Sequence, residues 1–196
     1  MSGSLPAMRI ALDIDSTLHH YWDELAGSVK RRFGVVLPYH EQRTWQITRL
    51  RDEQLRVAIA DTHSDAAIVR ARPYPHAVET INAWHDEGHF IHVTSHRAQT
   101  CRAATERWLE GIGLHYDELY CSYDKIGHCQ EIDIGLLIDD SPDNIVRALE
   151  VGIAAATLRH PWNQDVCEEE DVICGADWPE LASRLDPLLG GDRRAA

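Results

Sequence analysis

RIALDIDSTL, residues 9–18 of the chain, joins an apolar run to two closely spaced acids. The run 10–12 predicts a buried strand. Asp13 and Asp15 follow it, and side chains two positions apart on a strand point to the same side. Two converging carboxylates repel each other unless a cation or a shared proton lies between them. The stretch therefore indicates a divalent metal site or a paired acid–base site, with a surface loop that happens to carry two aspartates as the alternative.

A second acidic strand end lies far downstream. The apolar run 135–138 predicts another buried strand, and Asp139 and Asp140 follow it. Ser141 and Pro142 then have the residue types of a helix N-cap and first helical position. Parallel α/β sheets bind ligands where the carboxyl ends of their strands meet. We therefore expect the two acid pairs to lie side by side and to form a hard-cation site with oxygen ligands.

Two more polar strand ends fit the same edge of a sheet. The run 90–93 leads into Thr94 and Ser95, and Lys125 follows the short apolar run 119–121. A solvated loop lysine is the alternative for Lys125 taken alone. Together with the acid pairs, however, a lysine in this place indicates a buried cation at the site.

These strand ends resemble, in type and order, the four motifs of the haloacid dehalogenase (HAD) superfamily. That superfamily consists mainly of magnesium-dependent phosphohydrolases that work through an aspartyl-phosphate. The resemblance implies an α/β fold with a Rossmann-like three-layer parallel-sheet core and a small α-helical cap inserted after the first strand. Receiver domains of two-component signalling also combine Asp, Thr and Lys, but here a second acid pair follows the lysine. In chain order the matching residues are Asp13, Asp15 and Thr17, then Thr94 or Ser95, then Lys125, then Asp139 and Asp140.

The resemblance implies a role for each catalytic residue. Asp13 would attack phosphorus and form the covalent intermediate. Asp15 would protonate the leaving oxygen and later deprotonate the attacking water. Thr94, with Ser95 as the alternative hydroxyl, would bind the phosphoryl group. Lys125 would offset the charge of the nucleophile and of the substrate.

The same resemblance implies Mg²⁺ as the cofactor. Asp13, the backbone carbonyl of Asp15 and a carboxylate of Asp139 or Asp140 would hold it. Which of the last two binds the metal directly is left open by the sequence. A calcium-binding EF-hand loop starting at Asp13 is disfavoured, because its sixth position needs glycine and Leu18 stands there.

Roughly 55 residues separate the first two predicted strands, far more than one crossover needs. They resemble the cap of HAD phosphatases, which gives a core of residues 1–17 and 74–196 and a cap of residues 18–73. Within the cap, Trp22, Trp45 and Tyr21 are candidates for contact with a flat substrate group, and packing within the cap is the alternative. The expected cap helices are 21–33, 41–50 and 52–60.

The rest of the chain alternates strands and helices, which predicts a parallel sheet covered by helices. The expected strands are 89–93, 118–121, 135–138 and 153–158, and the expected helices are 75–87, 99–110, 142–150 and 177–189.

The 5′(3′)-deoxyribonucleotidases are the subgroup that the chain resembles most, through residues 136–140, 161–163 and 177–178. That subgroup usually has Gly-Val where Ser16 and Thr17 stand. We therefore expect a magnesium-dependent phosphomonoesterase for a small phosphate ester, with a (deoxy)nucleoside monophosphate as one candidate. The alternatives are a phosphatase for another metabolite, such as a sugar phosphate, and a catalytically silent module that binds a phospho-ligand.

The charge and the hydrophobic content of the chain indicate which kinds of partner it can bind. The chain has 196 residues, a formal net charge of −13 and 44% hydrophobic residues. An acidic protein binds polyanions poorly, so we expect a small-molecule substrate and no nucleic acid polymer. No apolar run of membrane-spanning length and no signal-peptide pattern occurs, so we expect no membrane partner and a cytoplasmic protein. The five cysteines include no CxxC pair, so they indicate neither a zinc site nor a disulfide framework. The oligomeric state is left open, a homodimer being one arrangement.

Overall fold

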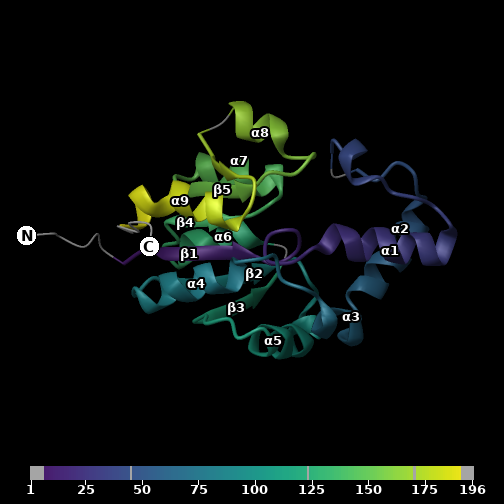
Figure 1. The fold of residues 1–196 in the computed structure, drawn as a ribbon, viewed down its shortest axis with the longest axis horizontal. Helices are drawn as coiled ribbons and strands as arrows, with labels where there is room; N and C mark the ends of the chain where they lie inside the picture. Colours follow the sequence, from purple (N-terminus) through teal and green to yellow (C-terminus); the bar gives the residue numbers. More distant parts are fainter. Residues whose placement is uncertain (1–6, 45, 123, 170, 191–196) are drawn as a thin grey trace, which may run out of the picture.

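A parallel six-stranded sheet is the centre of the computed structural model, which describes residues 7–44, 46–122, 124–169 and 171–190 (Figure 1). The strand order is β3-β2-β1-β4-β5-β6, and every neighbouring pair is parallel. The fold class expected from the sequence is therefore confirmed. The strands are β1 (Arg9–Asp13), β2 (Phe90–Ser95), β3 (Glu118–Cys121), β4 (Leu136–Ile138), β5 (Ala154–Leu158) and β6 (Ile173–Gly175).

Helices cover both faces of this sheet, because the central strand is apolar on both sides. Ile10 and Leu12 of β1 pack into the larger core cluster, together with the helices that cover one face of the sheet, α4 (Ala77–Asp86), α5 (Arg102–Gly111) and α9 (Trp178–Leu189). Ala11, between them, faces the other way and packs with α6 (Lys125–Glu131) and α7 (Pro142–Glu150). The alternation of side chains along a strand thus produces three layers. The helices after β2 are η2 (Gln99–Cys101), α5 (Arg102–Gly111), α6 (Lys125–Glu131), α7 (Pro142–Glu150), α8 (Gln164–Glu169) and α9 (Trp178–Leu189).

The segment between β1 and β2 is largely helical. It contains α1 (Tyr21–Phe33), η1 (Tyr39–Glu41), α2 (Asp52–Thr62) and α3 (Asp65–Arg70), and α4 (Ala77–Asp86) follows. Figure 1 shows α1 and α2 to one side of the sheet, beyond the carboxyl end of β1. A separate hydrophobic cluster holds this segment together. The division into a core and a cap at residues 17/18 and 73/74 stays a prediction.

The predicted helix 41–50 is wrong. Only the short η1 forms there, and the described residues from 42 to 50 contain no helix. The amide of Gln42 instead donates to the backbone carbonyls of Thr44 and Gln46. Side-chain bonds of this kind compete with helical backbone bonds. The β-branched residues Thr44, Ile47 and Thr48 further lower the helix propensity.

The sequence also left some short elements unassigned. These are α3, α6, α8 and β6, each of seven residues or fewer. Helix α6 begins at Lys125, and Asp124 caps it by accepting a bond from the amide of Gly127. None of the helices in the described part of the chain is long and apolar enough to cross a bilayer.

Candidate active site

The carboxyl ends of β1, β2 and β4 bring the predicted motif residues together. Asp13, the last residue of β1, is in register with Thr94 of β2. Leu12 pairs with Ile138 of β4, so Asp139 follows at the same level. A cavity of about 400 Å³ opens at this edge. It is lined by Asp13, Asp15, Tyr21, Ile59, His63, His96, Lys125, Asp139, Asp140, Ser141, Asp143 and Asn144.

Lys125 joins two of the acidic strand ends. Its Nζ donates to Oδ1 of Asp13 at 2.5 Å and to Oδ2 of Asp139 at 2.7 Å. The lysine side chain is 1% exposed, so these carboxylates replace its water. Burial lowers the pKa of Lys125, but Asp13 and Asp139 outweigh burial and raise that pKa above its usual range. The solvated-loop reading of Lys125 is therefore wrong, and the ammonium is a fixed charge of the site.

Asp13, Asp139 and Asp140 form a buried cluster of acids. One carboxylate oxygen from each lies within 4.8 Å of the others. Burial raises the pKa of Asp13 to about 7, helped by Asp139 and opposed by Lys125. Burial and the negative charge of Asp13 likewise hold the pKa of Asp140 well above its usual range. Repelling oxygen donors of this kind fit a hard divalent cation.

Neighbouring groups orient the two acids after β4. The backbone amide of Ser141 and the side-chain amide of Asn144 both donate to Asp139. Asp140 accepts a 3.1 Å bond from the indole of Trp162. Hydrogen bonds of this kind fix the orientation of carboxylates that bind metals. These neighbours therefore hold the carboxylates of Asp139 and Asp140 in place.

Asp15 has different partners from the other acids. Arg97 Nη2 donates to its Oδ1 at 2.7 Å, and His19 Nε2 lies 2.7 Å from the same oxygen. His63 Nε2 lies 3.7 Å from Oδ2. Burial raises the pKa of Asp15, but Arg97 and then His19 outweigh burial and hold that pKa well below its usual range. The carboxylate of Asp15 is therefore held ionised by its cationic partners, whereas burial raises the pKa of Asp13 despite its contact with Lys125.

Sequence reasoning missed Arg97. Arg97 is 2% exposed, and its guanidinium also donates to Thr105 of α5. Its position in the sequence could have indicated it. Arg97 follows Ser95 by two residues, at the edge of the sheet where the acids were predicted to lie. An arginine that follows a strand end beside several acids is a candidate partner for one of them.

The structure distinguishes the two candidate hydroxyls. Thr94 is fully buried beside Asp13, and its Oγ1 has no hydrogen-bond partner among the described residues. Ser95 Oγ accepts a bond from the backbone amide of Arg97. The unused hydroxyl is thus that of Thr94, on the strand position next to Asp13.

The loop after Asp15 is held by the body of the protein. Ser16 has φ 62, a left-handed conformation that favours glycine. His160 Nε2 donates to the carbonyl of Ser16 at 2.8 Å, and the indole of Trp178 donates to the carbonyl of Thr17 at 3.1 Å. These bonds stabilise the loop that carries Asp15.

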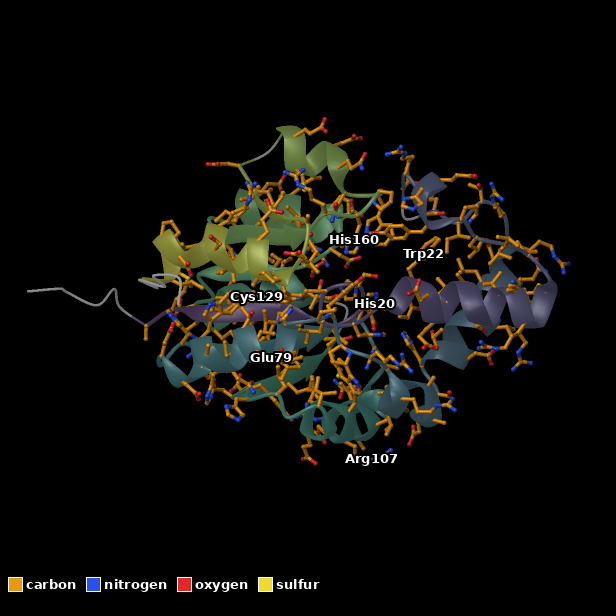
Figure 2. All side chains as sticks on the ribbon, in the orientation of Figure 1. His20, Trp22, Glu79, Arg107, Cys129 and His160 are labelled. Atoms are coloured by element: carbon orange, nitrogen blue, oxygen red, sulfur yellow. The ribbon has the colours of Figure 1, made fainter. Side chains whose placement is uncertain are left out.

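The aromatic residues of segment 18–73 that are candidates for substrate contact do not line the same cavity. Tyr21 lines the acidic cavity, and its hydroxyl accepts a bond from Thr62. Trp22 is 4% exposed and lines a separate cavity of about 580 Å³ that also contacts His160. Figure 2 shows Trp22 and His160 near each other, where the segment carrying α1 meets the sheet. Trp45 lies outside the described residues.

Comparisons with known proteins agree with this architecture. No family model matches the chain. A Bacillus cereus protein named "Putative nucleotidase" is 24% identical over 147 residues, which cover 69% of this chain and 77% of that protein. A predicted phosphoglycolate phosphatase from Haemophilus somnus 129pt has a TM-score of 0.64 at 17% identity, over 95% of this chain and 100% of that one.

Two further solved structures are similar. A HAD family hydrolase from Deinococcus radiodurans R1, with bound phosphate and sodium, has a TM-score of 0.63 at 17% identity over 94% of this chain and 96% of its own. A predicted phosphatase from Clostridium acetobutylicum has the same TM-score at 15% identity, over 92% and 99%. The fold of this chain is therefore the one shared by these phosphatases and hydrolases, as its sequence motifs predicted.

Proposed function

From the haloacid dehalogenase fold of this chain we infer that it is a phosphatase, and we propose that it hydrolyses a small phosphate monoester through an aspartyl-phosphate on Asp13. One observation carries the proposal. The acids of two strand ends, Asp13 and Asp139, converge at the carboxyl edge of the sheet, and the ammonium of Lys125 lies within 2.7 Å of a carboxylate oxygen of each. A phosphate ester is anionic, and an attacking carboxylate needs such fixed positive charge and in-line positioning.

Asp13 is the nucleophile of the proposal. Its Oδ would bond to phosphorus as the bond from phosphorus to the leaving oxygen breaks, and water would then attack the acyl phosphate and release Asp13. The contact with Lys125 orients the carboxylate and offsets its charge. The unpartnered hydroxyl of Thr94, on the adjacent strand, supports a role in binding the transferred phosphoryl group.

Asp15 is the acid–base residue of the proposal. In the protein without substrate it is ionised, because Arg97 and His19 stabilise the carboxylate. A bound phosphate dianion adds negative charge beside Asp15 and so raises its proton affinity. Asp15 would give its proton to the leaving oxygen and take one from the attacking water in the second step.

Magnesium is the cofactor we propose for the acid cluster. The donor set fits it, because three buried carboxylates repel one another and all ligands are oxygen. Asp13, Asp139 and Asp140 would hold the ion, with the backbone carbonyl of Asp15. The ion would supply Lewis-acid charge to the phosphoryl oxygens.

A nucleoside monophosphate is the substrate class we propose. The name of the Bacillus cereus relative supports it at low identity. Aromatic side chains also border the acidic cavity, where the Tyr21 and His63 rings lie 5.8 Å apart. A flat leaving group could contact these rings. The segment 18–73 would then act as a cap that selects the leaving group.

A panel of phosphate esters tests the function directly. Purified protein is assayed for phosphate release from nucleoside monophosphates, sugar phosphates and p-nitrophenyl phosphate, with MgCl₂ or with EDTA. We expect turnover that requires Mg²⁺, and none for Asp13→Asn, since an amide cannot form the acyl phosphate. Asp65→Asn is the matched control, because Asp65 is exposed on α3. Equal activity of Asp13→Asn and wild type would refute the mechanism.

A further inference from the structure

A second group of metal-ligand side chains lies on the sheet, away from the acidic cluster. His92 occupies the middle of β2, where it pairs with Ala11 of β1 and with Glu118 of β3. Ala11 faces the layer that contains α6, so His92 faces that layer too. Helix α6 carries His128, whose ring centroid lies 5.2 Å from that of His92. Three elements therefore bring two imidazoles and one carboxylate together.

His92 is buried, with the carboxylate of Glu118 3.4 Å from its Nδ1. It is 1% exposed, and neither of its ring nitrogens has a hydrogen-bond partner among the described residues. A buried polar atom without a hydrogen bond is destabilising. An imidazole nitrogen without a hydrogen bond is, however, available to bind a metal ion.

The spacing of the three groups matches a transition-metal site. Ligand atoms from His92, Glu118 and His128 all lie within 4.8 Å of one another. His92 Nδ1 lies 3.4 Å from Glu118 Oε2. Metal–ligand bonds of about 2.0–2.1 Å in a tetrahedron separate neighbouring ligands by about 3.3 Å. The distance between His92 Nδ1 and Glu118 Oε2 is therefore close to the distance between two ligand atoms of a tetrahedral metal site.

Of the three side chains, His128 is held in place by a neighbouring ring and Glu118 is accessible to solvent. The ring of His128 stacks on that of Tyr120 at 3.8 Å with an interplanar angle of 18°. The side chain of Glu118 is 54% exposed, which gives an ion a path from solvent. Three protein ligands with an open side suit zinc with a water as the fourth ligand.

We propose that His92, His128 and Glu118 bind a divalent metal ion of the zinc class. The imidazole ligands select such an ion over magnesium, which prefers oxygen. The ion would tie α6 to β2 and β3. Because α6 begins at Lys125, the site would also stabilise the helix that presents this lysine to the acidic cluster.

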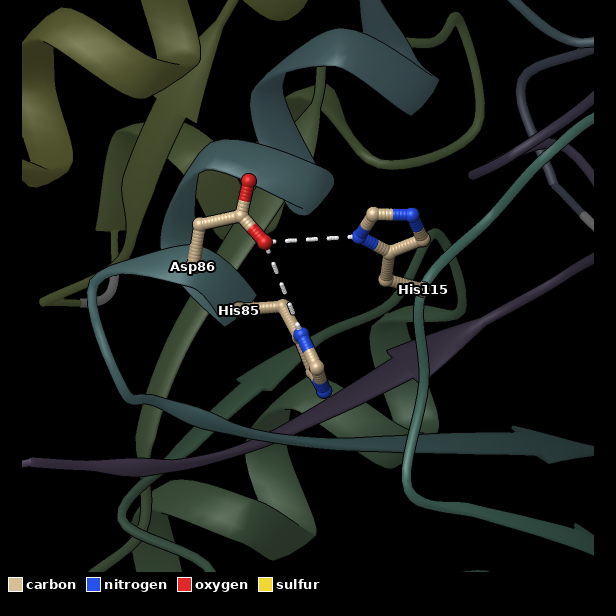
Figure 3. Close-up of side chains that lie close together, drawn as sticks. All are labelled: His85, Asp86 and His115. Atoms are coloured by element: carbon tan, nitrogen blue, oxygen red, sulfur yellow. Dashed lines mark ion pairs between the residues drawn. The ribbon is translucent and has the colours of Figure 1, made fainter.

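Another His/Asp group lies on the surface and supplies a control. His115 Nδ1 lies 3.4 Å from Asp86 Oδ1, and His85 Nδ1 lies 3.9 Å from the same oxygen (Figure 3). The side chain of Asp86 is 68% exposed and that of His115 is 53% exposed. No ring nitrogen of this group is both buried and unpartnered, so its contacts need no metal to explain them.

Zinc binding to the full chain tests the proposal. Protein stripped with a chelator is titrated with ZnCl₂ by calorimetry, in excess MgCl₂ to occupy the acidic cluster. We expect one zinc ion per chain and a higher melting temperature. CoCl₂ should give the visible absorption of a tetrahedral site.

Matched variants locate the ion. We expect His128→Gln and Glu118→Gln to weaken zinc binding at least tenfold and to remove the cobalt absorption. Both side chains are partly exposed, so these variants should fold, and their circular dichroism spectra check this. His115→Gln should bind zinc as wild type does. The proposal fails if wild type binds no zinc, if His128→Gln binds it equally well, or if His115→Gln loses it.

Discussion

Arg97 Nη2 donates a 2.7 Å hydrogen bond to Asp15 Oδ1, joining residues 82 positions apart in the sequence. Both groups are largely buried, with side chains 1% and 19% exposed. Charge-assisted bonds of this kind are short and strong. The bond fixes the carboxylate beside Asp13 and explains why two acids two residues apart have pKa values shifted in opposite directions.

Arg97→Met should impair both activity and stability. Without the guanidinium, the buried carboxylate of Asp15 loses its partner, and breaking a buried pair costs about 3–5 kcal/mol of unfolding free energy. Phosphatase activity should fall by about 10²–10⁴, the range for lost acid–base catalysis. Urea unfolding and initial rates measure the two effects.

Arg107→Met is the control for Arg97. Arg107 forms a 2.9 Å pair with Asp65, but its side chain is 53% exposed on α5, where Figure 2 shows it at the outer side of the helix. Loss of such a surface pair should cost less than about 1 kcal/mol and leave the rate unchanged. If both arginine variants behave alike, Asp15 does not depend on Arg97.

The strand ends could be predicted from the sequence because their signals are local. Asp13 and Asp139 each follow an apolar run directly, and parallel pairing brings such ends to one edge. Arg97 could not be assigned in this way. Its partner depends on a side-chain direction that the packing of α5 determines, through the bond to Thr105.

The inserted segment was harder to predict for a related reason. The described residues from 42 to 50 do not follow a helical period, because Gln42 bonds to nearby backbone carbonyls and Ile47 and Leu50 are buried against α1 and α2. For Trp22 the sequence left two roles open, contact with a flat substrate group and packing within the cap. Its contact with Trp162, 140 positions away, could not be read from the sequence.

Lys125→Met should destabilise the protein most when divalent ions are absent. The variant leaves Asp13 and Asp139 buried without their shared ammonium, at a cost of about 3–5 kcal/mol. Mg²⁺ should restore part of the loss, because the acid cluster becomes more negative. Urea unfolding in EDTA and in MgCl₂ provides the comparison.

Lys30→Met controls for the loss of a lysine. Lys30 is exposed in the last turn of α1, so its removal should change stability little in either buffer. A Lys125→Met protein as stable in EDTA as Lys30→Met would show that the buried bridge contributes no stability.

His160 should make the protein less stable in mild acid. Burial lowers the pKa of His160 to about 4, although its bond to the Ser16 carbonyl opposes the shift. The unfolded chain takes up this proton near pH 6.5. Between pH 6.5 and 4 the unfolded state therefore binds more protons, and stability falls as the pH falls. At pH 5 the loss from this group should be about 2 kcal/mol relative to pH 7.5.

His160→Gln removes that titration while keeping a polar side chain. The variant should be less stable than wild type at pH 7.5, since it loses the ring stacked 4.5 Å from Trp162. Its unfolding free energy should nevertheless vary less between pH 7.5 and 5. His40→Gln, at an exposed position, should keep the wild-type slope. An unchanged slope in His160→Gln would assign the acid sensitivity to other groups.

Trp22→Ala distinguishes a packing role from a substrate contact. Trp22 is 4% exposed and its ring lies 5.5 Å from that of Trp162, which in turn donates to Asp140. Because the ring is packed, we expect its loss to lower the unfolding free energy by about 3–5 kcal/mol. The value of kcat/KM should fall by the same factor for a nucleoside monophosphate and for a small ester.

If Trp22 instead stacks on a base, KM for the nucleotide alone should rise, since stacking contributes about 1–3 kcal/mol. Trp22→Phe, which keeps an apolar ring, should recover most of the stability. A selective rise in KM at an unchanged melting temperature would contradict the packing role.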